Sequence, residues 1–239
     1  MNRITLLAQR LPKRPRNVLV VALSAAFSAF VGVASTPAQA FSAMVSPPRF
    51  ELRAKPGETL REVLEISHAD SSPGGYRFAT ADWTFAADGT VAFSESLATN
   101  SCRPWVAIER RTANLPPNGR MKFRVEITVP AGTPASECRF ALLVQGDDQV
   151  VRSGSLPVPV AGRIGVIFYV SVAGAAPKLA ITPNGTQVID NVSAPLLKVT
   201  NTGDAHGRIG GVLSGVDARG QKFELVPTGL PILAGETRV

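Results

Sequence analysis

The two cysteines, Cys102 and Cys138, are the residues of this chain whose types predict the most definite chemistry. They follow an amino-terminal segment typical of export, and exported chains meet an oxidising compartment in which paired cysteines form disulfides. We therefore expect a Cys102–Cys138 disulfide, which would close a loop of about 36 residues and stabilise the fold by roughly 3–4 kcal/mol. A reactive thiol pair is the alternative, but the sequence has no C-x-x-C motif and no histidine close to either cysteine.

The two histidines, His68 and His206, lie in stretches typical of polar loops. Neither has a cysteine, a second histidine or a carboxylate at a metal-ligand spacing, so we expect both rings to be solvent-exposed and no metal site. The adjacent carboxylates Asp147 and Asp148 fit an exposed turn. Motifs of serine hydrolases, zinc metalloproteases and P-loop proteins do not occur in the sequence. We therefore expect no enzymatic activity, no cofactor and no small-molecule substrate.

The segment Met1–Ala40 has the three parts of a secretory signal peptide. It begins with cations and no acid, continues with an apolar run from Val18 to Ala34, and ends with the small-x-small pattern Ala38-Gln39-Ala40. We expect cleavage after Ala40. A retained membrane anchor is the alternative, because the apolar run approaches the length of a spanning helix.

The basic charge of the whole chain comes largely from this leader. Removing its five cations lowers the formal net charge from +7 to +2. A mature chain so close to neutrality has no electrostatic signature of a nucleic-acid-binding protein. We therefore expect no nucleic-acid partner.

The longest regular pattern lies in Ser155–Val172. Eight of the nine even-numbered residues from Leu156 to Val172 are apolar, and a period of two is typical of a β-strand. Pro157 and Pro159 cannot donate to a sheet ladder, so we expect the first half of this strand at a sheet edge. An exposed apolar edge favours the docking of another chain. The alternative is an ordinary edge strand whose apolar face covers its own core.

Alternation also predicts neighbouring strands. Apolar residues recur at every second position from Met121 to Val129 and from Cys138 to Val144, so we expect these faces, Cys138 included, to point into the core. Four further residues that flank an Asp-Gly hairpin signal are expected in the core: Trp83, Phe85, Val91 and Phe93. Many such strands, separated by Gly- and Pro-rich turns, predict an all-β protein.

The spacing of the strands predicts two domains. About seven strands between residues 44 and 172 fit an antiparallel sandwich. We expect a leader at 1–40, a first sandwich at 41–173, a linker at 174–177 and a second sandwich at 178–239. The last segment has about half the residues that a sandwich needs, so we expect an incomplete second domain or a sequence truncated at Val239.

Several short motifs in this exported chain resemble those of one known family. They are Val45-Ser46, Arg53-Ala54, Gly57-Glu58, Leu64–Ser67, Leu115–Gly119, Lys122–Val125, Ile167–Tyr169 and Val199–Gly203. On these residues the mature chain is similar over most of its length, at low identity, to the periplasmic pilus-assembly chaperones of the chaperone–usher pathway. The resemblance implies two immunoglobulin-like β-sandwich domains and a periplasmic location.

The resemblance further implies that the long strand, about residues 150–172, binds a subunit. In that family the last strand of the first domain is added to an incomplete pilus subunit, and its alternating apolar side chains fill the open core of the subunit. The matching subunit-binding residues here are Leu156, Val158, Val160 and Ile164.

The family also anchors the terminal carboxylate of the subunit between an arginine of the first strand and a lysine near the end of the long strand. Two cations suit a carboxylate because each forms a charge-assisted hydrogen bond with it. Arg53 matches the arginine through the following Ala54, and Arg49 is the alternative. Val166 stands at the position of the lysine, and the nearest cation is Arg163. Either Arg163 replaces that lysine or the chain binds something else.

The function implied by the resemblance is that of a non-enzymatic periplasmic chaperone. It would stabilise pilus or fimbrial subunits by donating a strand and deliver them to an outer-membrane usher. The alternative is an exported immunoglobulin-like structural or adhesive module without chaperone activity. An exposed stripe of Leu156, Val158 and Val160 favours the chaperone, and a stripe buried in the chain's own core favours the module.

Overall fold

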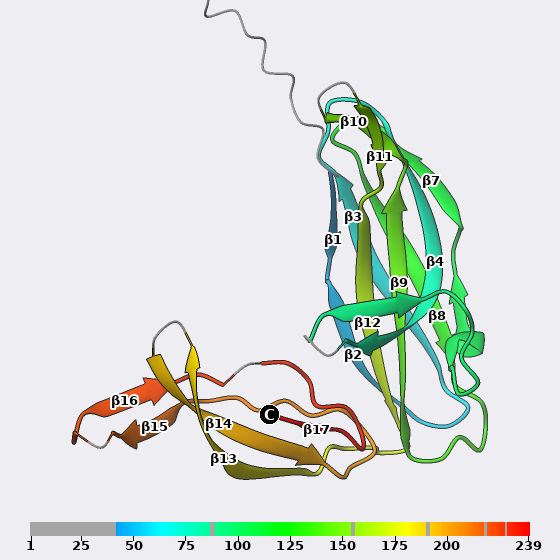
Figure 1. Ribbon diagram of the computed structural model, residues 1–239. Helices are drawn as coiled ribbons and strands as arrows, with labels where there is room; N and C mark the ends of the chain where they lie inside the picture. The colour runs from blue at the N-terminus through cyan, green and yellow to red at the C-terminus, as the bar shows by residue number, and fades with distance from the viewer. Residues whose placement is uncertain (1–41, 87–88, 154–155, 190–191, 218, 228) are drawn as a thin grey trace, which may run out of the picture. The chain divides into compact units, whose positions relative to one another are not determined.

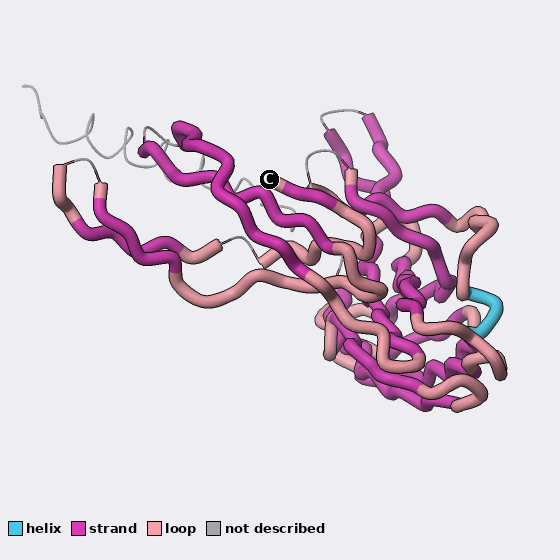
Figure 2. The backbone as a smooth tube through the Cα atoms, turned by 90° about the horizontal axis from the view of Figure 1, so that it is seen from below, coloured by secondary structure: helices cyan, strands magenta, loops and turns pink. Residues whose placement is uncertain are grey.

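The computed structural model describes residues 42–239 except 87–88, 154–155, 190–191, 218 and 228 (Figure 1). The expected leader and its cleavage site therefore lie outside the described residues. The described elements are β-strands apart from one short 3₁₀-helix, η1 (Arg103–Trp105), as Figure 2 shows. The predicted all-β class is confirmed. In the described part of the chain, no helix has the length and apolar character needed to cross a membrane.

Two sheets make up a sandwich between residues 43 and 172. One sheet has the order β1 (Ala43–Ser46), β3 (Thr59–His68), β8 (Arg120–Thr128), β6 (Val106–Ile108). The other has the order β2 (Arg49–Ala54), β12 (Arg163–Val172), β9 (Ser136–Gly146), β4 (Gly74–Phe85), β5 (Val91–Ser94), and β7 (Thr112–Leu115) also pairs with β4. β2 runs parallel to β12, whereas β9 is antiparallel to it.

The main core lies between these two sheets, because alternate residues of each strand point to the same side. Phe168 of β12 stacks between Phe50 and Phe140, with ring centroids 4.6 Å apart on each side. The predicted inward faces are confirmed for the residues that are buried, namely Phe123, Val125, Ile127, Val129, Cys138, Phe140, Leu142 and Val144. Met121, the first residue of the predicted face, is only partly buried against this core. Removal of this apolar surface from water is the main source of stability.

A smaller apolar cluster covers the outer face of the β12–β9–β4 sheet. Trp83 is buried there against Tyr169, while Phe85 and Phe93 are partly buried around it. The prediction that Val91 lies in the core is wrong, because Val91 is 39% exposed. Val91 begins the short strand β5, which pairs only with the end of β4 within the described residues.

The predicted single strand of about 150–172 is wrong. The structure divides it into β10 (Gln149–Ser153), β11 (Leu156–Val160) and β12, with a break at Ala161-Gly162. β10 and β11 pair with each other and, in the described part, with no other strand, so they form a two-stranded ribbon. Gly162, the one even-numbered residue from Leu156 to Val172 without an apolar side chain, lies at this break.

The remaining strands form two small sheets. One has the order β13 (Leu179–Ile189), β14 (Val192–Asn201), β17 (Thr237–Arg238), and the other pairs β15 (Leu213–Val216) with β16 (Lys222–Leu225). Asn201 is fully buried at the end of β14, with Val199, Ala205 and Ile232 also buried. Residues 40–239 form one compact unit, and the division into domains at 174–177 stays a prediction.

Candidate functional site

The ribbon of β10 and β11 presents an apolar stripe to solvent. Leu156, Val158 and Val160 share one face of β11 by their spacing, and they are 66%, 37% and 49% exposed. None of the three belongs to either apolar cluster of the sandwich. An apolar stripe on a strand with an unpaired edge is the arrangement to which another strand can add.

Ile164 differs from these three residues. It lies on β12 opposite Val144 and packs against the main core. The structure therefore does not bring Ile164 together with Leu156, Val158 and Val160, although all four share one parity in the sequence.

On the side that faces β2, only the second half of β12 has a strand partner among the described residues. β2 pairs with β12 from Ile167 to Val172, and the Ile167 amide donates to the Pro48 carbonyl at 3.2 Å. On this side the segment from Arg163 to Val166 has no strand partner among the described residues. We refer to β11 together with Arg163–Val166 as the free edge.

The three predicted anchoring arginines lie at different levels of the sheet. Arg163 starts β12, and its guanidinium contacts Gln145 at 3.1 Å and Glu95 at 3.3 Å. Arg49 lies opposite Ile167 and pairs with Glu51 at 2.8 Å. Arg53 lies opposite Ser171, eight positions after Arg163 along β12, which corresponds to about 26 Å. Arg53 and Arg163 therefore cannot hold the same carboxylate.

Val166, at the position where the resemblance places a lysine, is fully buried in the main core. A cation cannot be accommodated there without a partner, because an isolated buried charge is strongly destabilising.

A cavity of about 360 Å³ lies beside Arg53. β2, β12 and the segments Ala175–Pro177 and Ala205–Arg208 line it, and it includes the side chains of Tyr169, Ser171 and His206. Sequence reasoning missed Arg208, because nothing in the local sequence indicates that this residue folds back onto β2 and β12.

Both histidines are more buried than predicted. His206 stacks on Tyr169, its amide donates to Glu137 at 3.1 Å, and its Nδ1 lies 2.5 Å from Glu137 Oε2. His68 ends β3 and is 7% exposed, with Nδ1 2.6 Å from the Tyr76 hydroxyl and Nε2 2.7 Å from the Ser72 carbonyl. The burial of His68 could have been predicted from the sequence, because His68 continues the inward alternation of Leu64 and Ile66.

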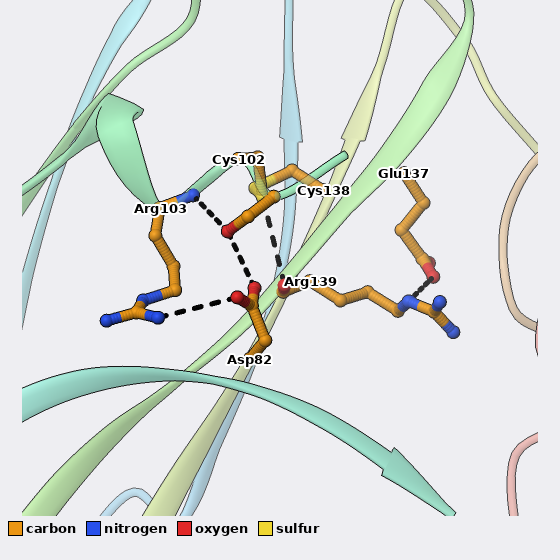
Figure 3. Close-up of a disulfide and its surroundings, with 7 residues drawn as sticks. Asp82, Cys102, Arg103, Glu137, Cys138 and Arg139 are labelled. Atoms are coloured by element: carbon orange, nitrogen blue, oxygen red, sulfur yellow. Dashed lines mark hydrogen bonds and ion pairs between the residues drawn. A yellow bond between two sulfur atoms is a disulfide. The ribbon is translucent and has the colours of Figure 1, made fainter. Parts of the chain in front are cut away.

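The cysteines form the predicted disulfide, with a Cα–Cα distance of 5.7 Å (Figure 3). It attaches the segment before η1 to β9. Around it, Asp82 accepts hydrogen bonds from the Ser101 hydroxyl at 2.6 Å and from the Ala98 amide at 3.1 Å, and contacts Arg103 at 3.4 Å. The disulfide and Asp82 together hold the Ala98–Arg103 segment against the sandwich. Among the described residues, no group of histidine, cysteine, aspartate and glutamate side chains could hold a metal ion.

Comparisons with known proteins relate the fold to solved structures. No protein-family model and no curated protein sequence matches the chain. A chain of a chaperone–tip adhesin complex of CFA/I fimbriae biogenesis is 9% identical over 82% of this chain and 87% of its own length, with a TM-score of 0.51. The chain has a β-sandwich fold found in that complex.

Two further matches have lower TM-scores. The class 5 fimbriae chaperone CfaA is 11% identical over 82% of this chain and 84% of its own, with a TM-score of 0.49. A structure of the Salmonella enterica SafA pilin with the SafB chaperone is 14% identical over 84% and 83%, with a TM-score of 0.48. At these identities the likeness is one of fold.

Proposed function

We propose that this chain is a periplasmic chaperone that binds a pilus or fimbrial subunit along its free edge and delivers it to an outer-membrane usher. The single observation that carries the proposal is the exposure of Leu156, Val158 and Val160 outside the chain's own core. The sequence motifs of the chaperone–usher family support it. In this proposal the leader is removed after Ala40, and the protein is not an enzyme.

Two kinds of interaction hold the subunit in this proposal. Unpaired backbone groups of the free edge form a strand ladder with the subunit, and the stripe enters an open groove in its core. Each aliphatic side chain that passes from water into an apolar groove contributes up to about 1.5–3 kcal/mol. Leu156 contributes most, since it is the most exposed of the three.

Arg49 is the best-placed of the predicted anchors for the terminal carboxylate of the subunit. A strand added to the free edge must end where β2 begins to pair with β12, and Arg49 lies at that level, opposite Ile167. Arg163 is held by Glu95 and Gln145, and Arg53 lies four residues further along β2.

The test is a pull-down from periplasmic extract with the purified chain, with mass spectrometry of the captured proteins. Val158→Glu places a charge in the stripe, and Val63→Glu is the matched control, because Val63 is 47% exposed on β3. We expect a small exported β-protein in equal amount with the unchanged chain and with Val63→Glu, and none with Val158→Glu. Recovery of envelope material that both variants retain would instead favour a structural or adhesive module.

A further inference from the structure

The ring of Phe93 lies over Gly165, a residue of the free edge. A Cβ atom on Gly165 would lie 2.3 Å from Cζ of the ring, so the ring occupies the place where a side chain of Gly165 would stand. In the order of the strands, β9 and β4 separate β5 from β12, which corresponds to about 14 Å in a flat sheet. The contact is therefore made across the outer face of the sheet.

The end of β4 and the strand β5 form an arm that folds over this outer face. In the described part of the chain, β4 pairs with β9 at residues 76–81, whereas residues 82–85 pair with β5. We refer to residues 82–85 and 91–95 as the arm. Three aromatic residues of the arm belong to the smaller apolar cluster: Trp83, Phe85 and Phe93. Burial of these rings holds the arm against the sheet.

Polar contacts fix the end of the arm next to Arg163. The Glu95 carboxylate contacts the Arg163 guanidinium at 3.3 Å, and the Glu95 carbonyl accepts a hydrogen bond from Arg103 at 3.0 Å. Arg103 also contacts Asp82 of β4 at 3.4 Å, and the disulfide attaches the preceding residue, Cys102, to β9 (Figure 3). The ring of Phe93 therefore has a defined position before a second strand arrives.

Gly165 supplies backbone groups to the free edge. The Ile167 amide points to the side of β2, because it donates to the Pro48 carbonyl. Since the direction of the backbone groups alternates along a strand, the N–H and C=O groups of Gly165 point to the same side. On that side Gly165 has no strand partner among the described residues, so an added strand pairs with it directly.

The residue of an added strand that lies opposite Gly165 must contact the Phe93 ring. Side chains of directly opposite residues point to the same face of a sheet, with Cβ atoms about 4.5–5.5 Å apart. At Gly165 the ring takes the place of the side chain. Aromatic rings pair favourably with β-branched aliphatic side chains, whereas a polar side chain there loses water without gaining a hydrogen bond.

We propose that Phe93 is a specificity-determining residue of the free edge, which selects a partner strand with a β-branched apolar residue on its outward face opposite Gly165. Phe93 does not belong to the stripe of Leu156, Val158 and Val160, so it adds a second requirement to the sequence of the partner. The identity of the partner rests on the proposed function, whereas the contact with Phe93 is tested with peptides.

The test uses two synthetic peptides that are as long as the segment 156–166 and carry valine at every second position, both ends included. A strand added to the free edge ends before Ile167, so its residue opposite Gly165 lies near one end. The two outward positions nearest the ends are isoleucine in one peptide and asparagine in the other, and threonine fills the remaining positions. Nuclear magnetic resonance of the Gly165 amide in the isotope-labelled chain gives both dissociation constants.

We expect the unchanged chain to bind the isoleucine peptide more tightly than the asparagine peptide, by about threefold or more. Phe93→Ala removes the ring and should bring this ratio close to one. Gly165→Ala should do the same, because its methyl group displaces the ring. Phe85→Ala is the matched control, since Phe85 lies in the same arm but its ring contacts Trp83 and Arg238. The ratio should persist in that variant.

The ratio of the two affinities separates selection from a structural role, because a loosened fold weakens the binding of both peptides alike. The proposal is overturned by equal affinities in the unchanged chain, by the absence of a saturable shift with either peptide, or by a ratio that survives in Phe93→Ala. Equal loss of the ratio in Phe85→Ala also overturns it, since the effect then belongs to the whole arm. Subunit capture is measured separately in the pull-down, so the two proposals can fail independently.

Discussion

The ring of His206 lies stacked on the ring of Tyr169, with centroids 3.8 Å apart and an interplanar angle of 30°. Trp83 contacts the same tyrosine edge-on at 5.6 Å. A residue after β14 and a residue of β4 thus cover one tyrosine of β12. This packing raises the pKa of Tyr169, because it removes the hydroxyl group from water.

The two tyrosines of the chain, Tyr76 and Tyr169, should both ionise at higher pH in the folded protein than in the unfolded chain. Burial raises the pKa of Tyr169 although Arg208 opposes the shift, and burial with nearby Asp70 and Asp147 raises the pKa of Tyr76. Because the folded-state pKa values are raised, their stabilising contribution is present below about pH 10 and is lost as the pH rises through them. Ultraviolet absorbance of tyrosinate, compared between native and urea-unfolded protein, measures this shift.

Tyr76→Phe provides the control for that titration, because it leaves Tyr169 as the single tyrosine. The remaining curve should still lie above the urea-unfolded curve. Coincident native and unfolded curves in this variant would contradict the burial of the Tyr169 hydroxyl.

Ile164→Ala should destabilise the fold, whereas Val158→Ala should not. Ile164 packs partly against the main core, so its truncation should lower the free energy of unfolding by about 1–3 kcal/mol, less than for a fully buried isoleucine. Val158 lies outside the core, and its truncation should stay within about 0.5 kcal/mol. Urea denaturation measures both, and equal losses would mean that the stripe is part of the core.

Loss of the disulfide should destabilise the protein through its unfolded state. The cysteines are separated by 36 residues, for which the loop-entropy estimate is about 4 kcal/mol. The double variant Cys102→Ala with Cys138→Ala should show this loss in urea denaturation. A reducing agent should destabilise the unchanged chain by a similar amount and leave the double variant unaffected, and any other pattern argues against the pairing.

Asn201→Ala should loosen the loop that carries His206 and Arg208. The Asn201 side chain accepts hydrogen bonds from the amides of Lys178 and Gly203 and donates to the carbonyls of Ala205 and Ile232. Its removal leaves these groups without partners and should cost at least about 2 kcal/mol.

Hydrogen exchange of residues 202–208 is the direct measurement for that variant, and it should become faster. Thr202→Ala is the control, because Thr202 is exposed and, among the described residues, forms only one long side-chain hydrogen bond, at 3.5 Å to the Lys178 carbonyl. Equal exchange in both variants would mean that Asn201 does not hold the loop.

The period-two alternation in the sequence predicted the features of the fold that depend on a single strand. The inward faces of β8 and β9 follow directly from their period of two. The disulfide was predicted from the two cysteines together with the export segment, because exported chains meet an oxidising compartment. The all-β class followed from the same pattern repeated along the chain. These predictions needed no knowledge of which strand pairs with which.

Features that depend on distant partners were not predictable. Leu156 and Ile164 share one parity, yet one is exposed and the other packs on the core, because the chain leaves the sheet at Ala161-Gly162. Arg208 and His206 join the cavity only because the loop after β14 folds back onto β2 and β12. The local sequence of this loop contains no pattern that predicts its contact with β2 and β12.

The parallel pairing of β2 with the second half of β12 limits how far another strand can extend along β12. Any strand that adds to the free edge can extend from Leu156 as far as Val166, and there the Ile167 amide is already bound to Pro48. The position of the Pro48 carbonyl therefore sets the point at which any strand added to this edge must end. A shift of β2 by two residues along β12 would lengthen or shorten that strand by about 7 Å.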